Sequence, residues 1–188
     1  MMIATETMTK ISLEEFLQLP ETKPANEYFN GEIEQKIMPQ GQHSRIQTRL
    51  ATEINQIAES QKLALAFTEL RCTFANRSIV PDIAVFTWSR IPTNPQGRIA
   101  NKFNTYPDWI IKIFSPEQST NKVVKKILFC LNQGSKLGWL IDPEDESVMI
   151  FIPDKFPQIL SNDEILPVLE SLKHWELSVN QLFDWLTV

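Results

Sequence analysis

Two carboxylates and several lysines in this chain are of the residue types found in the active sites of enzymes that hydrolyse phosphodiesters. Asp82 follows Pro81 at the start of an apolar segment, and Glu69 lies in the segment before it. If the ends of neighbouring strands bring Asp82 and Glu69 together, their oxygens can hold Mg²⁺ or Mn²⁺. A lysine beside them can orient the attacking water or offset the charge of a phosphate. The pattern therefore indicates metal-dependent hydrolysis, although Pro-Asp before a strand is a common pair.

Lys112 is the least expected charge in the sequence. It lies at the centre of the stretch 108–116, which reads DWIIKIFSP and is apolar on both faces. Such a strand is typical of the middle of a sheet that is covered on both sides. An unpaired buried charge is costly, so Lys112 must reach solvent, pair with a carboxylate or take part in chemistry.

The elements that position these residues follow from hydrophobic periodicity and turn residues. Apolar stripes and stop signals predict helices over about 43–60, 119–133 and 179–186, and capping boxes at Ser12 and Ser178 mark two helix starts. Asn30-Gly31 predicts a tight hairpin turn. Strands are expected over 63–74, 83–87, 109–114, 137–141 and 148–152, with a turn over 75–80. The strand-helix-strand unit over 109–141 predicts a parallel pair, which is typical of an α/β fold, and the strand over 148–152 is expected to be antiparallel.

The segment 88–108 is long and contains three prolines. A connection of this length inside a compact domain is uncommon and often functional. Two interpretations stay open: an ordered surface excursion held by Trp88, Phe103 and Tyr106, or a lid that faces the substrate.

Composition sets the broad class. The chain has 188 residues, 43% of them hydrophobic, and a net charge of −5. We expect one domain over residues 11–188 after a loose tail over 1–10, without a global basic surface for nucleic acid. The two cysteines, Cys72 and Cys130, lie in apolar segments and are expected to be buried, reduced thiols. Neither a signal peptide nor a membrane span is evident, so a cytoplasmic protein is expected.

Five stretches follow one another in a definite order: HSRIQTRL, SIVPDIAVF, YPDWIIKIFSPEQS, a lysine-bearing helix and LGWLIDP. Together they resemble the Uma-type family of restriction endonucleases. This family is a branch of the PD-(D/E)XK nuclease superfamily. EYFNGEI and LSVNQLFDWL are similar to the same family, so the resemblance covers nearly the whole chain. It implies a restriction endonuclease-like core, which is a central mixed β-sheet flanked by helices with an N-terminal hairpin. It also implies a Mg²⁺ or Mn²⁺ cofactor, DNA as the partner, and a homodimer.

The same resemblance assigns residues. Asp82 matches the metal-binding aspartate of the family's Pro-Asp motif, and Glu69 is a further carboxylate for the metal. The catalytic lysine of the family corresponds to Lys122 or Lys126, which share a helix face. Of these two we take Lys122.

Lys112 departs from the family, which has a glutamate at this position. The change places an ammonium where a second carboxylate would hold the metal, and two like charges about 4 Å apart repel by about 4 kcal/mol at an effective dielectric constant of about 20. Three interpretations follow. Lys112 pairs with Asp82 and replaces the metal, or it is a catalytic lysine with Glu69 as the second acid, or it points away from the site.

Two residues of the first long helix have open roles. His43 at its start either packs there or contacts the site, and Glu53 is either a solvated residue or a further acid near the metal. The sequence therefore predicts a metal-dependent DNA endonuclease whose metal site is impaired by Lys112. The alternative is a catalytically inactive nuclease-fold protein that acts by binding or dimerisation.

Overall fold

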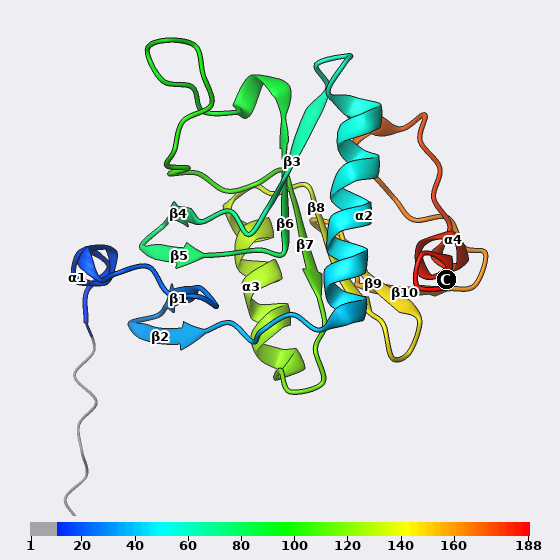
Figure 1. The fold of residues 1–188 in the computed structure, drawn as a ribbon, viewed down its shortest axis with the longest axis horizontal. Helices are drawn as coiled ribbons and strands as arrows, with labels where there is room; N and C mark the ends of the chain where they lie inside the picture. Colours follow the sequence, from blue (N-terminus) through cyan, green and yellow to red (C-terminus); the bar gives the residue numbers. More distant parts are fainter. Residues whose placement is uncertain (1–10) are drawn as a thin grey trace, which may run out of the picture.

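Two β-sheets and the helices around them form residues 11–188, the part of the chain that this computed structural model describes (Figure 1). The loose tail expected over residues 1–10 lies outside the described residues. The larger sheet has the strand order β10-β9-β8-β7-β6-β3. Its strands are β3 (Ala64–Thr68), β6 (Ile83–Thr87), β7 (Trp109–Ile113), β8 (Leu137–Asp142), β9 (Ser147–Phe151) and β10 (Gln158–Ser161). The α-helices are α1 (Leu13–Gln18), α2 (Gly41–Ala58), α3 (Thr120–Gln133) and α4 (Val179–Asp184).

The large sheet is mixed, as the sequence predicted. β7 and β8 are parallel and are joined by α3, whereas the other neighbouring strands are antiparallel. β7 lies inside the sheet between β6 and β8, and all five of its residues are buried. The expectation of a central, doubly covered strand around Lys112 is therefore confirmed.

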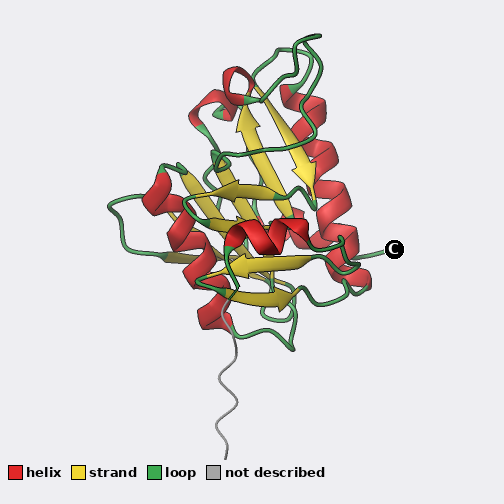
Figure 2. Ribbon diagram, turned by 90° about the vertical axis from the view of Figure 1, so that its left-hand side faces the viewer, coloured by secondary structure: helices red, strands yellow, loops and turns green. Residues whose placement is uncertain are grey.

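The two long helices cover opposite faces of the large sheet (Figure 2). Alternate residues of β7 point to opposite faces, which is the two-residue period of a strand. Trp109, Ile111 and Ile113 belong to the core beneath α2 and α4, whereas Ile110 belongs to the core beneath α3. Lys112 has the parity of Ile110, so its side chain starts on the α3 face.

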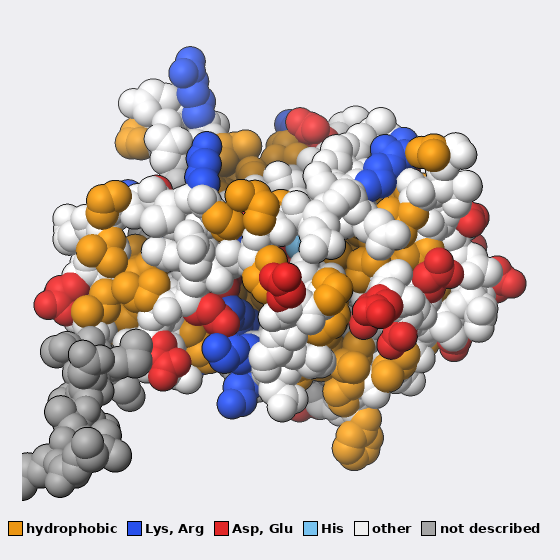
Figure 3. Space-filling model, turned by 60° about the horizontal axis from the view of Figure 1, so that its bottom comes forward, with side chains coloured by type: hydrophobic (Ala, Val, Ile, Leu, Met, Phe, Trp, Pro, Cys, Tyr) orange, Lys and Arg blue, Asp and Glu red, His pale blue; other side chains and the backbone are white. Residues whose placement is uncertain are grey.

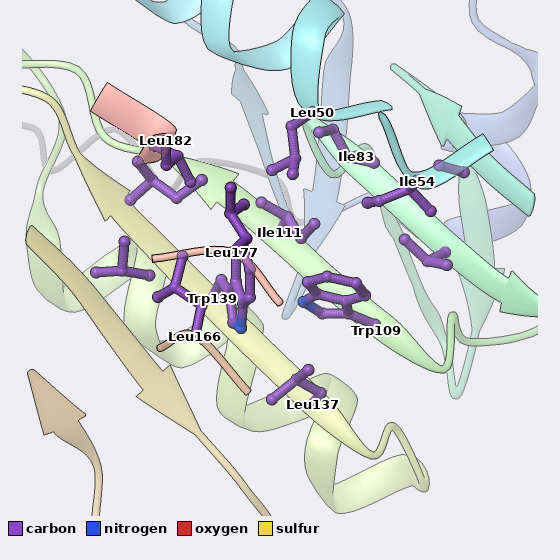
Figure 4. Packing of buried hydrophobic residues seen from close by; sticks show 14 of the residues in the cluster. Leu50, Ile54, Ile83, Trp109, Ile111, Leu137, Trp139, Leu166, Leu177 and Leu182 are labelled. Atoms are coloured by element: carbon purple, nitrogen blue, oxygen red, sulfur yellow. The ribbon is translucent and has the colours of Figure 1, made fainter. Parts of the chain in front are cut away.

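The core beneath α2 and α4 is dense and apolar (Figure 4). Trp109 and Trp139, on adjacent parallel strands, meet edge to face with ring centroids 4.6 Å apart. Leu50 and Ile54 of α2 pack on them from above, and Leu182 comes from α4. This core fixes the central strands, and with them the direction of every side chain on the other face.

A smaller sheet, in the order β2-β1-β5-β4, lies beside the large one. Its strands are β1 (Asn26–Phe29), β2 (Glu32–Gln35), β4 (Cys72–Phe74) and β5 (Arg77–Ile79). The predicted N-terminal hairpin is confirmed, with Asn30 and Gly31 both at positive φ (56° and 84°). Arg77 joins this sheet to α3, because its guanidinium carbon lies 4.1 Å from the ring centre of Phe29 and 4.0 Å from that of Phe129.

The single strand predicted over 63–74 is wrong. The chain leaves the large sheet at Thr68 and enters the small sheet at Cys72, and Glu69 between them has φ of 52°. The alternation of residues cannot reveal such a change of sheet, since both halves keep a strand pattern. The turn predicted over 75–80 is also shorter than expected, because only Ala75 and Asn76 turn before β5 begins.

One face of α3 carries a buried charge. Lys126 is buried, whereas the apolar Leu128 is 41% exposed. The reason is that the β1–β2 hairpin brings two carboxylates, Glu27 and Glu34, onto this side of the helix, where they bind Lys126. The predicted stop of α3 at Gly134 is confirmed by its left-handed conformation, with φ of 119°.

The segment 88–108 is an ordered excursion that begins with a short 3₁₀ helix (Trp88–Arg90). Phe103 is buried and pairs with Cys72, and Arg90 donates to the Tyr106 carbonyl. The segment joins the end of β6 to the start of β7, and these strands are antiparallel. It therefore lies at the opposite end of the pair from Asp82, and the interpretation as a lid over Asp82 is wrong.

Several local predictions are confirmed. Both capping boxes are present, at Ser12 with Glu15 and at Ser178 with Gln181. Cys72 and Cys130 are free and buried. Among residues 11–188, no helix combines the length and the apolar character that crossing a membrane requires.

Candidate active site

Asp82 is the centre of a buried cluster of charged side chains at the start of β6. Its side chain is 1% exposed, and Oδ2 accepts a hydrogen bond from the backbone N–H of Ile113, at 2.8 Å. This bond ties the carboxylate to the end of the neighbouring strand β7. The other oxygen, Oδ1, faces three side chains that come from different parts of the chain: Lys36, Lys112 and His43.

Lys112 contacts Asp82, so the interpretation in which it points away is wrong. Its Nζ lies 3.5 Å from Asp82 Oδ1, and its side chain is 3% exposed. Burial and the nearby ammonium of Lys36 lower the pKa of Lys112, and Asp82 only partly offsets this. Lys112 is thus a buried cation held mainly by one carboxylate.

Lys36 makes the shortest contacts in the cluster, and no pattern in the sequence distinguishes it from other lysines. Its Nζ lies 2.8 Å from Asp82 Oδ1 and 2.6 Å from Glu69 Oε2. Burial lowers its pKa, but the two carboxylates outweigh this effect and raise the pKa above its ordinary value. Lys36 follows β2 in an irregular connection to α2, where no periodicity separates a buried lysine from a solvated one.

Glu69 reaches the cluster because of the bend between β3 and β4. Its backbone N–H donates to the Asp82 carbonyl at 3.3 Å, and its side chain remains 44% exposed. Gln47 of α2 holds both acids in place, since its Nε2 donates to Glu69 Oε1 and to the Asp82 carbonyl, each at 2.8 Å. The expected meeting of Asp82 and Glu69 is therefore present, with Lys36 between them.

His43 belongs to the cluster, and Glu53 does not. The imidazole is 8% exposed, with Nε2 3.6 Å from Asp82 Oδ1 and Nδ1 3.4 Å from the Ser115 hydroxyl. Glu53 instead pairs with Arg49 on its own helix, at 2.6 Å. It stands ten residues after His43, which is about 15 Å along an α-helix.

A second ionic group lies between α3 and the β1–β2 hairpin. Lys126 Nζ contacts Glu27 Oε2 at 2.5 Å and Glu34 Oε2 at 2.9 Å, and Glu27 Oε1 accepts the backbone N–H of Val80. Lys122, which the sequence favoured as the catalytic lysine, is 60% exposed and pairs with Glu34 at 3.2 Å. Of the two helix lysines, Lys126 is the one directed toward the buried acids.

The balance of charges explains the pKa of Asp82. Burial raises this pKa, but the ammonium groups of Lys112 and Lys36 together with His43 outweigh burial and hold it well below the ordinary value. Asp82 is therefore ionised at neutral pH.

Figure 3 shows the bottom face of the molecule, where Lys and Arg side chains form a short band directly beside Asp and Glu side chains.

The residues present fit a divalent metal only in part. His43, Glu69 and Asp82 each offer a ligand atom, and these atoms lie within 4.8 Å of one another. However, the Lys36 ammonium already contacts both carboxylates, and the Lys112 ammonium contacts Asp82 as well. Two cations beside the same carboxylate disfavour a dication by Coulomb repulsion. With both lysines charged, this site does not fit Mg²⁺ or Mn²⁺.

The mixed sheet, the flanking helices and the Asp82 cluster place the chain in the restriction endonuclease-like class of folds. A family described as "Uma2: Putative restriction endonuclease" matches residues 13–180, and the chain belongs to this family. A crystal structure described as "a putative nuclease belonging to DUF820 from Anabaena variabilis ATCC 29413" is 50% identical, with a TM-score of 0.92. The match covers 94% of this chain and 99% of that one. No curated protein matches the chain.

Proposed function

We propose that this protein is a DNA endonuclease-family domain with an impaired metal centre, in which Lys112 and Asp82 form an ion pair in place of a metal site. The observation that carries the proposal is the contact of Lys112 with Asp82 inside the sheet, where both side chains are at most 3% exposed. By the family resemblance, a glutamate belongs at position 112. DNA as the partner and Mg²⁺ or Mn²⁺ as the ancestral cofactor rest on the family. The homodimer and the cytoplasmic location stay predictions from the sequence.

A count of charges supports an internal replacement for the metal. A glutamate together with a bound dication contributes a net charge of +1 to the site, and a protonated lysine contributes the same +1. Lys112 therefore balances the surrounding carboxylates without a metal ion. Because an unpaired buried charge is costly, this balance explains how the fold keeps Asp82 ionised beneath α3.

The test is metal binding by calorimetric titration with Mn²⁺ and Mg²⁺. We expect weak binding by the wild-type protein and stronger binding by Lys112→Glu, because that substitution removes a cation and adds a carboxylate ligand. Asp82→Ala in the Lys112→Glu background is the control, and it should abolish the gain. Tight binding by the wild-type protein that is lost on Asp82→Ala would contradict the proposal.

A second candidate is an active nuclease with a rearranged site. It is favoured by the proximity of ligand atoms from His43, Glu69 and Asp82. In this case Lys112 is a catalytic lysine, and Glu69 supplies the second acid. Cleavage of plasmid DNA separates the candidates: cleavage by wild type but not by Asp82→Ala establishes the active enzyme, whereas a lack of cleavage that Lys112→Glu restores supports the impaired centre.

A non-catalytic role by binding is the remaining alternative. It predicts retention of a DNA fragment by wild type and Asp82→Ala alike in a gel-shift assay, without cleavage by either protein. The net charge of −5 argues against strong non-specific DNA binding, because that affinity depends on phosphate neutralisation. Binding should therefore fall steeply as salt is added.

A further inference from the structure

Lys36 and Lys112 differ in how they contact the acids of the site. Lys36 touches both carboxylates, Glu69 at 2.6 Å and Asp82 at 2.8 Å, while Lys112 touches only Asp82, at 3.5 Å. The Lys36 side chain is 6% exposed although its residue lies in an irregular connection. The position between the two acids is thus filled by Lys36 and not by Lys112.

The backbone holds Lys36 in a different way from Lys112. Lys112 is part of β7, which lies between β6 and β8, and it pairs with Leu140 of β8. Lys36 has left the β2 strand, and its backbone N–H donates to the Ala25 carbonyl, which fixes its Cα at the end of the hairpin. Only the flexible four-carbon side chain spans from there to the acids.

A cavity offers the Lys36 ammonium a second location. It has a volume of about 190 Å³ and lies between the hairpin and the start of α3, with Lys36 in its wall. Glu34 and Glu117 also line it, so a displaced ammonium would meet carboxylates there. Lys112 is not among the residues that line this cavity.

We propose that Lys36 is a built-in cation that occupies the metal position between Glu69 and Asp82 and controls whether this site can bind a divalent cation. This inference rests on the proposed function, because it takes these acids as the remnant of a metal centre. It adds a residue from the hairpin that acts on the site directly. Removal of Lys36 leaves two carboxylates and an imidazole around the position between the acids, with Lys112 in contact with Asp82 alone, whereas removal of Lys112 leaves Lys36 between both acids.

The experiment compares Mn²⁺ affinity, measured by titration followed by electron paramagnetic resonance, for four full-length proteins. These are wild type, Lys36→Met, Lys112→Met and the control Lys173→Met, which breaks an exposed lysine–glutamate pair elsewhere in the chain. Methionine keeps an apolar side chain of similar length without the charge. We expect Lys36→Met to bind Mn²⁺ at least about tenfold more tightly than wild type. Lys112→Met should gain less than about threefold, and Lys173→Met should not differ from wild type.

Lys36→Arg tests the role of charge. It should bind Mn²⁺ no better than wild type, because a guanidinium also neutralises the two acids. The inference is overturned if Lys36→Met binds like wild type, or if Lys112→Met gains as much as Lys36→Met. If Lys36→Met does not fold in metal-free buffer, folding restored by added Mn²⁺, followed by circular dichroism, supports the inference, and failure to fold at any Mn²⁺ concentration overturns it.

The two proposals fail in different measurements. A Lys112→Glu protein that gains no metal affinity, in the wild-type and in the Lys36→Met background alike, counts against the impaired centre described above. A Lys36→Met protein that gains none counts against the built-in cation, whatever the Lys112→Glu protein does.

Discussion

Asp82 and Asp108 are two versions of the same local pattern. Each follows a proline, each precedes a central strand of the large sheet, and each is 1% exposed. Because β6 and β7 are antiparallel, the two aspartates lie at opposite ends of this strand pair. Their local Pro-Asp patterns are the same, yet their surroundings are different.

Asp108 is bound by residues at the end of β6 and in the connections beside it. Its Oδ2 accepts hydrogen bonds from the backbone N–H and the hydroxyl of Thr87, at 2.8 and 2.9 Å. Its Oδ1 pairs with Arg90 at 3.0 Å and Lys136 at 3.4 Å, which are 26% and 63% exposed. Burial raises the pKa of Asp108, but the bonds from Thr87 and the charge of Arg90 outweigh burial and lower it.

Asp82, in contrast, collects side chains from three distant segments. Lys36 comes from the hairpin connection, His43 from α2 and Lys112 from β7, and each is at most 8% exposed. Without Asp108, Lys136 stays in solvent and Arg90 keeps its hydrogen bonds to Thr105 and Tyr106, whereas the cations of Asp82 are all buried. Asp108 thus caps the end of a strand, whereas Asp82 is the counterion of two buried cations.

The largest expected loss of stability follows from replacing Asp82. Asp82→Ala leaves Lys36 and Lys112 without their shared partner, and breaking a buried ion pair in this way costs about 3–5 kcal/mol. The free energy of unfolding in urea measures this loss. Adding Lys112→Met to Asp82→Ala should recover part of it, and a double variant no more stable than the single one would contradict the assignment of Lys112 as a dependent cation.

A smaller effect is expected at the other aspartate. Asp108→Ala removes two hydrogen bonds to Thr87, which corresponds to about 2 kcal/mol for a part-buried pair left unsatisfied. Lys136 then stays solvated and Arg90 keeps its bonds to Thr105 and Tyr106, so less buried charge is stranded than at Asp82. The same urea titrations make the comparison direct, and a loss equal to that of Asp82→Ala would remove the distinction between the two sites.

The two carboxylates should lose their contributions to stability at different acidic pH values. Both have folded-state pKa values below the unfolded value of about 3.9, so each contributes stability that is present above about pH 4 and lost as the pH falls through its folded pKa. The pKa of Asp82 is held well below its ordinary value, so its contribution should be lost at lower pH than that of Asp108. Urea unfolding between about pH 5 and pH 2 measures this. Asp108→Asn should flatten the upper part of the acid limb, and an unchanged limb would contradict the pKa assignment.

The smallest effect is expected for an exposed partner of Asp108. Lys136→Met removes an ammonium that is 63% exposed and 3.4 Å from the carboxylate. Exposed ion pairs contribute about 0–1 kcal/mol and are screened by salt, so the change should fall within that range and vanish at high salt. A larger, salt-independent loss would mean that Asp108 also depends on a buried cation.

Local patterns in the sequence by themselves determined much of the fold. The two capping boxes, the Asn30-Gly31 hairpin, the helix stop at Gly134 and the central strand around Lys112 all follow from contacts within a few residues along the chain. The candidate acids Asp82 and Glu69 followed from residue types and strand order, and the family resemblance added the mixed sheet and the metal-binding role of Asp82. Such signals are readable because propensity, capping and periodicity act over short distances.

Tertiary structure alone decided which charges meet. The bend at Glu69 moves the chain between sheets, and the hairpin then carries Lys36 to the acids and Glu27 to Lys126. The family resemblance pointed to Lys122 or Lys126 on one helix face, and helix spacing cannot tell that the hairpin covers Lys126 and leaves Lys122 exposed. The sequence indicated that the buried charge of Lys112 requires a partner. The antiparallel pairing of β6 with β7 brought Asp82 next to Lys112, and the hairpin placed Lys36 beside it, because the cost of burial depends on what lies across the fold.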